Sequence, residues 1–116
     1  YFGMLGGKFV GKSAPPGRRG MHTFMVKIKT ARQVEDHPIT MGVDEYEVAD
    51  ELFVLEGDQT QWRVLARAEG HPIMYTKTFG KGRVFVNALG HGAQQLSYPA
   101  SQTLIVNAVE WVAGLR

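Results

Sequence analysis

Hydrophobic and polar positions alternate along several stretches of the chain, which is the pattern of half-buried β-strands. In one of them Phe24, Val26 and Ile28 share one side, whereas Lys27 and Lys29 lie on the other. A shorter stretch is apolar throughout and ends at a Gly-Asp turn, and we interpret it as a strand as well. The predicted strands cover residues 22–30, 51–55, 62–68, 73–79 and 83–89.

Two glycines separate the last two predicted strands. Gly80-Lys81-Gly82 is typical of a hairpin turn, because glycine tolerates the positive φ angles that tight turns require. The strand that follows contains Val84-Phe85-Val86, which is apolar on both faces. We therefore expect this strand to lie in the centre of a sheet and not at its edge.

Residues 101–113 have the spacing of an α-helix with a wide apolar surface. Leu104, Ala108 and Trp111 form one stripe, with further apolar residues beside it and only Asn107 and Glu110 interrupting the surface. The apolar residues beside the stripe are Ile105, Val109 and Val112. The flanking residues Ser97 and Gly114 are predicted to cap the helix and to end it. A single helix of this kind needs a covering partner, so we expect a missing N-terminal half or another subunit.

Composition narrows the class of protein. The chain has 116 residues, of which 44% are hydrophobic and 21% charged, as in globular domains. No apolar run approaches the roughly 20 residues that span a bilayer, so we predict no membrane partner. The absence of cysteine excludes disulfides and thiolate chemistry but leaves the cellular compartment open.

The charges fall into two blocks. Residues 1–34 carry seven Lys or Arg and no acid, whereas residues 35–58 carry nine Asp or Glu and no base. The basic block alone would suit nucleic acid, but the acidic block beside it would repel phosphate. We predict no nucleic-acid partner.

The segment Gly6-Gly7-Lys8-Phe9-Val10-Gly11-Lys12-Ser13 matches the letters of a phosphate-binding P-loop. A P-loop holds phosphate at the N-terminus of a helix that follows it. Here Pro15-Pro16-Gly17 comes next and cannot continue into such a helix. We predict a structural glycine turn, with residues 11–20 forming a loop, and no nucleotide cofactor.

Six short motifs occur in one order along the chain and together resemble the ThuA-like (trehalose-utilisation) family. They are Gly6-Gly7-Lys8-Phe9, His37-Pro38-Ile39-Thr40, Asp50-Glu51-Leu52-Phe53, Gly80-Lys81-Gly82-Arg83-Val84-Phe85, Leu89-Gly90-His91 and Trp111-Val112-Ala113-Gly114. The resemblance implies an α/β, flavodoxin-like domain related to class I glutamine amidotransferases, of which residues 1–116 form the C-terminal part. It also implies a carbohydrate ligand and a role in carbohydrate or glycoside catabolism.

The chain departs from the family pattern in ways that affect its chemistry. Lys12 stands where the family usually has a histidine, and the first half of the domain is expected to be absent. Glutamine hydrolysis of the usual kind needs a cysteine nucleophile, which this chain lacks. The resemblance therefore suggests a sugar-processing enzyme, hydrolase-like or lyase-like, and not a cysteine glutamine amidotransferase.

The predicted catalytic residues are His91 and Glu51. His91 follows an apolar strand and lies between Gly90 and Gly92, which leave room for a ligand at the strand end. Adjacent strand residues point to opposite faces, so of Asp50 and Glu51 only one is expected to face the site. We choose Glu51; the alternatives are that it is a solvated acid and that His91 only orders its own loop.

The predicted substrate-binding residues are His37, Lys12 and Gly90. The alternative for His37 is structural, because a histidine before proline often hydrogen-bonds its own turn. Lys12 would contact a sugar hydroxyl or carboxylate in place of the family histidine. The set His37, His91 and Glu51 could also hold a divalent metal, but no close-spaced histidine pair supports this, so we assign no metal.

Two classes of function remain open. One is a sugar-processing enzyme that uses His91 and Glu51 as acid and base. The other is a non-catalytic sugar-binding or protein-interaction module that keeps the fold without activity.

Overall fold

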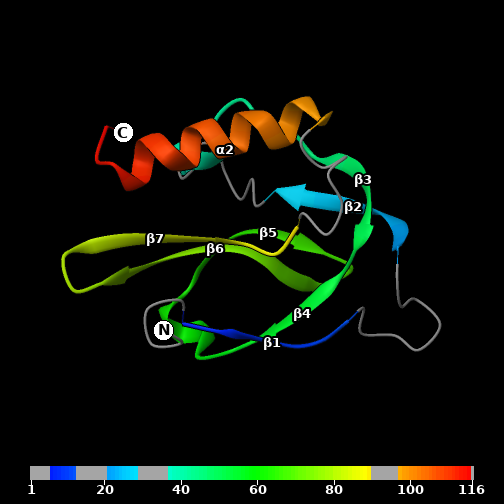
Figure 1. The fold of residues 1–116 in the computed structure, drawn as a ribbon, viewed down its shortest axis with the longest axis horizontal. Coiled ribbons are helices and arrows are strands. Elements are labelled where there is room, and N and C mark those ends of the chain that lie inside the picture. Colours follow the sequence, from blue (N-terminus) through cyan, green and yellow to red (C-terminus); the bar gives the residue numbers. More distant parts are fainter. Residues whose placement is uncertain (1–5, 13–20, 29–36, 90–96, 116) are drawn as a thin grey trace.

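A five-stranded antiparallel sheet with one long helix packed against it forms most of the molecule (Figure 1). The computed structural model describes residues 6–12, 21–28, 37–89 and 97–115. The strands of this sheet run in the order β3-β2-β5-β6-β7, and each pairs antiparallel with its neighbour. Their bounds are β2 Met21–Ile28, β3 Tyr46–Glu51, β5 Arg63–Ala68, β6 His71–Phe79 and β7 Gly82–Asn87.

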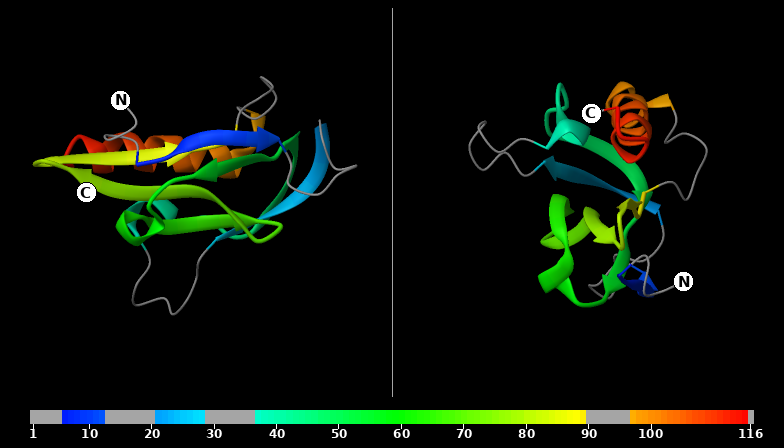
Figure 2. Two further views of the ribbon diagram at one scale, coloured as in Figure 1. Left: turned by 90° about the horizontal axis from the view of Figure 1, so that it is seen from below. Right: turned by 90° about the vertical axis from the view of Figure 1, so that its left-hand side faces the viewer.

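The remaining elements are a small second sheet, two short 3-10 helices and the long helix. In the second sheet β1 and β4 pair antiparallel, and Figure 2 shows this pair on the side of the molecule away from the helix. The bounds are β1 Lys8–Lys12, β4 Phe53–Glu56, η2 Pro38–Thr40, η3 Gln59–Gln61 and α2 Pro99–Val112.

The sequence patterns located four of the strands correctly, but β1 and most of β3 were not predicted. The predicted strands at 22–30, 62–68, 73–79 and 83–89 correspond to β2, β5, β6 and β7, and the Gly80-Lys81-Gly82 turn joins β6 to β7 with Gly80 at φ +59°. The apolar run at 51–55 is instead divided at Leu52, where β3 ends and β4 begins in the other sheet.

Two expectations about the sheet differ from the structure. Within the described residues β7 is an edge strand, and Val84–Val86 are half-buried and not central. The strand is apolar on both faces because Phe85 packs on the core under α2, whereas Val86 packs on Trp62 and Tyr75 on the other face. The flavodoxin-like class also implies parallel strands, but all pairings in the described part of the chain are antiparallel. The structure supports a mixed sheet and helix fold.

Two hydrophobic clusters lie on the two faces of the sheet. The larger one joins β2, β3, β5 and β6 to α2 through fully buried side chains such as Val26, Ile73 and Leu104. The smaller one contains Trp62 and Tyr75, whose rings stack with centroids 4.0 Å apart and planes 2° from parallel. Burying apolar area on both faces fixes the register of the central strands.

Gly6 and Gly7 lie against the smaller cluster, which gives these two glycines a structural role. The indole N–H of Trp62 donates to the carbonyl oxygen of Gly6 at 2.7 Å. A Cβ atom on Gly7 would lie 2.8 Å from the Trp62 ring, so only glycine fits there. The next residues form β1, including the first two positions of the predicted 11–20 loop, and a strand at this position is incompatible with a P-loop.

Helix α2 begins without a side-chain cap and ends at a glycine. Its N-cap is Tyr98, without a side-chain cap bond, so the predicted cap at Ser97 is wrong; Pro99 starts the helix instead. Gly114 does end it, at φ +81°. The amide of Gly114 donates to Trp111 and that of Leu115 to Glu110, which is the Schellman arrangement.

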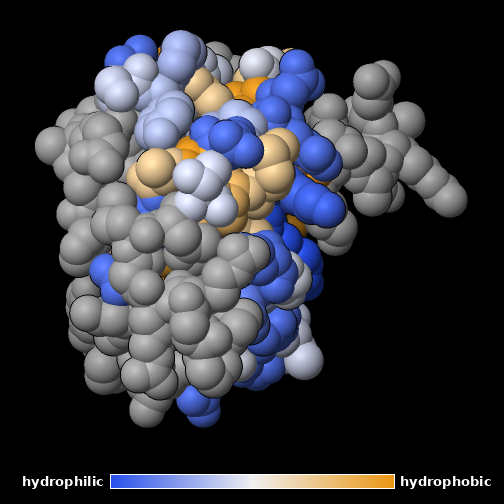
Figure 3. Space-filling view, turned by 90° about the vertical axis from the view of Figure 1, so that its right-hand side faces the viewer, coloured by the Kyte–Doolittle hydropathy of each residue, from blue (hydrophilic) through white to orange (hydrophobic). Residues whose placement is uncertain are grey.

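Part of the apolar surface of α2 is exposed, as its sequence predicts. Leu104 and Ala108 are buried against the sheet, whereas Val109 is 64% exposed, with Ile105 and Val112 also exposed. On the side that carries β3, Figure 3 shows another group of apolar side chains framed by hydrophilic ones. Within the described residues no helix is long and apolar enough to cross a lipid bilayer.

We expect the 116-residue chain on its own to self-associate through this face of α2, because exposed apolar patches drive association. Val109→Lys should shift the chain towards monomer in light scattering over a concentration series. Met25→Lys, an exposed position on β2, is the matched control and should leave association unchanged. A wild-type chain that is monomeric at all concentrations would contradict this expectation.

Candidate functional site

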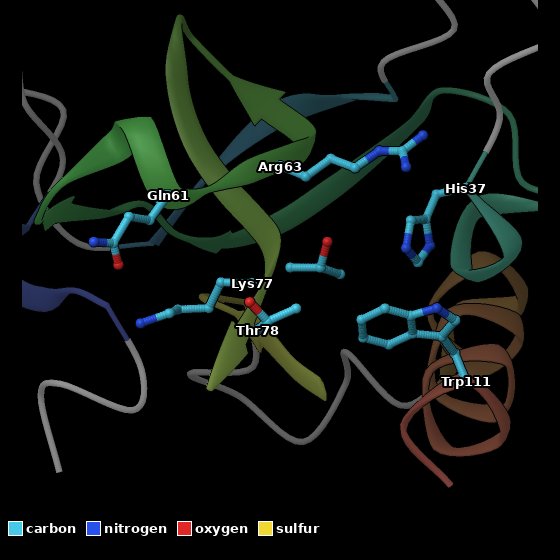
Figure 4. Close-up of a pocket in the computed structure, with 7 residues that line it drawn as sticks. His37, Gln61, Arg63, Lys77, Thr78 and Trp111 are labelled. Carbon is cyan, nitrogen blue, oxygen red and sulfur yellow. The ribbon is translucent and has the colours of Figure 1, made fainter. Parts of the chain in front are cut away.

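A polar cleft lies where η2, β5 and β6 meet the C-terminal end of α2 (Figure 4). Its volume is about 280 Å³. The described residues that line it are His37, Gln61, Arg63, Thr76, Lys77, Thr78 and Trp111. Except for the Trp111 ring, these side chains offer polar groups, and none of them is a carboxylate.

His37 is fixed by the turn that it caps. It has extended backbone angles, as expected before Pro38, and its Nδ1 accepts a hydrogen bond of 3.2 Å from the amide of Ile39. The Thr40 hydroxyl donates to the carbonyl oxygen of His37 at 3.1 Å. The four-residue motif thus builds a closed local unit, and the imidazole is only 5% exposed.

Asn107 of α2 holds this turn in place. Its Nδ2 group donates to the carbonyl oxygens of Ile39 and Met41, both at 3.0 Å, and its side chain is buried. The same helix brings Trp111 against His37, with ring centroids 4.8 Å apart and an angle of 65° between the planes. The wall made of His37 and Trp111 is therefore assembled by one helix face and one turn.

Arg83 of β7 also contacts Trp111. Its Nη1 donates to the carbonyl oxygen of Trp111 at 2.9 Å, and its guanidinium carbon lies 5.1 Å from the centre of the indole ring. The first contact satisfies a carbonyl in the last turn of the helix, and the second is a cation–π interaction. Both restrict the position of the Trp111 ring at the cleft.

The environment of His37 determines its charge. Burial, and to a smaller extent the nearby cations Arg63 and Arg83, together lower the pKa of the imidazole to about 4. The ring is therefore neutral at pH 7. Because Nδ1 accepts from Ile39, the proton of the neutral ring is on Nε2, which makes this atom a hydrogen-bond donor.

The sheet register brings the polar residues of β5 and β6 to one face. Arg63 is the Cα partner of Thr76, so their side chains lie on the same side of the sheet, and Thr78 follows two positions along that side. Figure 4 shows the Arg63 side chain extending towards His37, with Trp111 across the cleft. Lys77 projects to the opposite face, where its ammonium is 5.9 Å from the Phe79 ring centre.

Comparison with known proteins places the chain in a family. The family model described as ThuA, trehalose utilisation, matches residues 1–112. The chain belongs to the ThuA family. The fold is also similar to the crystal structure of a ThuA-like protein from Parabacteroides merdae, with a TM-score of 0.62 and 22% identity. That match covers 93% of this chain but 41% of the other, and no curated protein matches significantly.

Among the residues predicted from the ThuA resemblance, the structure places His37 in the cleft and Glu51 elsewhere. Glu51 is buried at the end of β3, opposite Met21 of β2, and its amide donates to Asp50 Oδ1 at 2.7 Å. Asp50 is also fully buried, and the prediction that only one of the pair faces a site stays a prediction. Glu51 is not one of the residues that line the cleft.

The other predicted residues stay predictions. Lys12 ends β1 opposite Phe53, but its side chain is outside the described part of the structure. His91 and Gly90 also lie outside the described residues. Among the residues that are described, no group of three or more His, Asp or Glu is arranged to hold a metal ion.

Arg63, Thr78 and Trp111 were missed as site residues because their roles depend on tertiary contacts. Arg63 and Thr78 look like solvent-facing positions of alternating strands, and Trp111 looks like part of the helix core stripe. The sequence contains one signal that could have identified Trp111 as a site residue. The Trp111-Val112-Ala113-Gly114 and His37-Pro38-Ile39-Thr40 motifs both belong to the family pattern, and their first residues are in contact.

The lowered pKa of His37 predicts how stability depends on pH. Below about pH 6.5 the unfolded chain takes up a proton at His37, whereas the folded chain does not until about pH 4. The free energy of unfolding should therefore fall by about 3 kcal/mol from this residue alone as the pH drops through this window.

Denaturant titrations of wild type and His37→Asn at several pH values measure this contribution. Asparagine keeps an acceptor for the turn but does not titrate. Most of the decrease in the free energy of unfolding between pH 6.5 and 4 should therefore disappear in this variant. His71→Asn, at the start of β6, is the control for removal of a histidine. Equal pH dependence in wild type and His37→Asn would show that His37 is not held neutral.

Proposed function

We propose that this chain takes part in carbohydrate or glycoside catabolism and that the cleft beside His37 and Trp111 binds the carbohydrate. The family description, trehalose utilisation, supports the role. The chain spans 41% of the ThuA-like protein of similar fold, so the activity of a whole protein is itself part of the proposal. The flavodoxin-like class likewise remains a proposal for a longer domain.

The observation that carries the proposal is an aromatic ring placed beside a set of hydrogen-bonding groups. A sugar ring has a C–H face that packs on aromatic carbon and hydroxyl groups around its edge that need polar partners. Trp111 offers the first surface, and Gln61, Thr78 and Nε2–H of His37 offer the second. A volume of about 280 Å³ is near the lower limit of small-molecule sites, which suits one sugar ring better than a whole disaccharide.

For the enzyme, we propose His91 and Glu51 as the acid and base, at a position apart from this cleft because Glu51 does not line it, and Lys12 and Gly90 as further substrate contacts. His37 is poorly suited to take up a proton at pH 7, because its pKa is about 4. We therefore assign it to binding and orientation of the sugar.

The second candidate is a sugar-binding module without catalysis. It is favoured by one observation, namely that no carboxylate is among the described residues that line the cleft. Glycoside hydrolysis commonly depends on carboxylate side chains near the scissile bond. If the chain is such a module, the cleft binds sugar, and hydrolysis takes place at another site or does not occur.

We expect Trp111→Ala to weaken binding of trehalose or glucose at least tenfold in calorimetry, because the packing surface for the sugar is lost. Trp111→Phe should retain most of the affinity. Val112→Ala, at the next position on α2 and exposed, is the matched control and should bind like wild type. Unchanged affinity in a folded Trp111→Ala variant would exclude this cleft as the sugar site.

Two further variants separate the two candidate functions when turnover of a glycoside is assayed in the full-length protein. The enzyme requires that His91→Ala and Glu51→Gln abolish turnover while sugar still binds. The module requires that sugar binds and that wild type shows no turnover.

A further inference from the structure

We infer that the cleft binds only the terminal glucose unit of a saccharide. The glycosidic oxygen of that unit lies at the open end of the cleft, and the opposite side of the ring, which carries the 4-hydroxyl group, lies at the buried end. The inference rests on the proposed function and states which part of the carbohydrate is recognised. It adds a specificity that the family description does not contain.

The first argument is that the cleft has one buried end and one exposed end. His37 is 5% exposed and Thr76 of β6 is 4% exposed, whereas Gln61 and Thr78, which line the same cleft, are exposed. Figure 4 shows Gln61 on the side of the cleft away from His37 and Trp111. A ligand therefore enters past Gln61 and Thr78 and ends against His37 and Trp111.

The second argument is that the buried end is closed. The rings of His37 and Trp111 are in edge contact, with centroids 4.8 Å apart, so a saccharide chain cannot continue between them. Two hydrogen bonds from Asn107 hold the turn that carries His37, and a hydrogen bond from Arg83 holds the carbonyl oxygen of Trp111. Opening this end would leave the buried Asn107 side chain without these partners, which is costly. Only a chain end fits against such a wall.

The third argument is the size of the cleft. Its volume of about 280 Å³ is near the lower limit of small-molecule sites. One sugar ring fills a cleft of this size, so the next ring of a disaccharide lies beyond its open end. The cleft should therefore contribute little to the affinity for that second ring.

The fourth argument comes from the chemistry of trehalose, the sugar in the family description. Its two glucose rings are joined through their anomeric carbons. If one ring fills the cleft and the other lies outside, the anomeric oxygen faces the open end and the 4-hydroxyl side of the ring faces the buried end. There Nε2–H of His37 is the imidazole group left to donate, because Nδ1 accepts from Ile39. A sugar hydroxyl can accept this hydrogen bond, whereas a bulkier substituent would meet the wall.

Calorimetry of the full-length protein with two pairs of ligands tests this orientation. Methyl α-glucoside, which is substituted at the anomeric oxygen, should bind with an affinity within threefold of those of glucose and trehalose. 4-O-methylglucose, which is substituted on the opposite side of the ring, should bind at least tenfold more weakly. Maltohexaose and α-cyclodextrin contain the same number of glucose units with the same linkages, but only the linear molecule has a chain end. We expect maltohexaose to bind like glucose and α-cyclodextrin not to bind.

The Trp111→Ala variant shows whether these ligands occupy the cleft. It should weaken the binding of glucose, methyl α-glucoside and trehalose by the same factor, because each of them places one ring on the indole. Val112→Ala is again the matched control, and thermal melts of each variant establish that it is folded.

Each outcome decides the matter. The inference is overturned and the proposed function stands if α-cyclodextrin binds as tightly as maltohexaose, or if 4-O-methylglucose binds like glucose. The same holds if trehalose binds tenfold or more tightly than methyl α-glucoside, because the second ring would then be held as well. If no sugar binds, or if a folded Trp111→Ala variant binds all of them like wild type, the proposed function fails and the inference fails with it.

Discussion

The two hydrogen bonds from the Asn107 amide to the carbonyl oxygens of Ile39 and Met41 are the contacts on which the site depends. Buried polar groups without partners are costly, so a helix with an asparagine on its buried side has to meet acceptors there. The η2 turn supplies them. This attachment brings His37 against Trp111 and closes one end of the cleft, although the residues concerned are far apart in the sequence.

The remaining walls follow from the sheet. Hydrophobic burial on both faces fixes the register of β5 against β6, and this register places Arg63 beside Thr76. The apolar stripe of α2 then sets the helix on that sheet with Trp111 at the cleft. Apolar packing thus places the guanidinium and the indole, whereas the hydrogen bonds of Asn107 place the imidazole.

Much of the fold could be predicted from the sequence because its signals are local. Strand alternation, the Gly80-Lys81-Gly82 turn and the stop at Gly114 depend on nearest neighbours and were found where expected. Strand order was not predictable in the same way. A strand that is apolar on both faces, such as β7, can result from central burial or from two separate clusters, and only the tertiary arrangement distinguishes them.

The candidate site was predicted in part for the same reason. The hydrogen bond of His37 to its own turn could be predicted because the motif 37–40 is local, whereas its role in binding stays a prediction. Asn107 was interpreted as an interruption of an apolar surface, whereas it is buried and bonded to a distant turn. Arg63 and Trp111 become site residues only when β6 and α2 are in place. No local pattern marks them.

Nitrogen-15 NMR across a pH titration measures the tautomer and the pKa of His37, and it tests most directly whether the turn and the helix hold the ring as described. We expect a neutral ring with its proton on Nε2, an unprotonated Nδ1 and a pKa of about 4. A pKa near the ordinary 6.5, or a neutral ring with its proton on Nδ1, would contradict it. Either result would mean that the turn, Asn107 and the two arginines do not hold His37 as described.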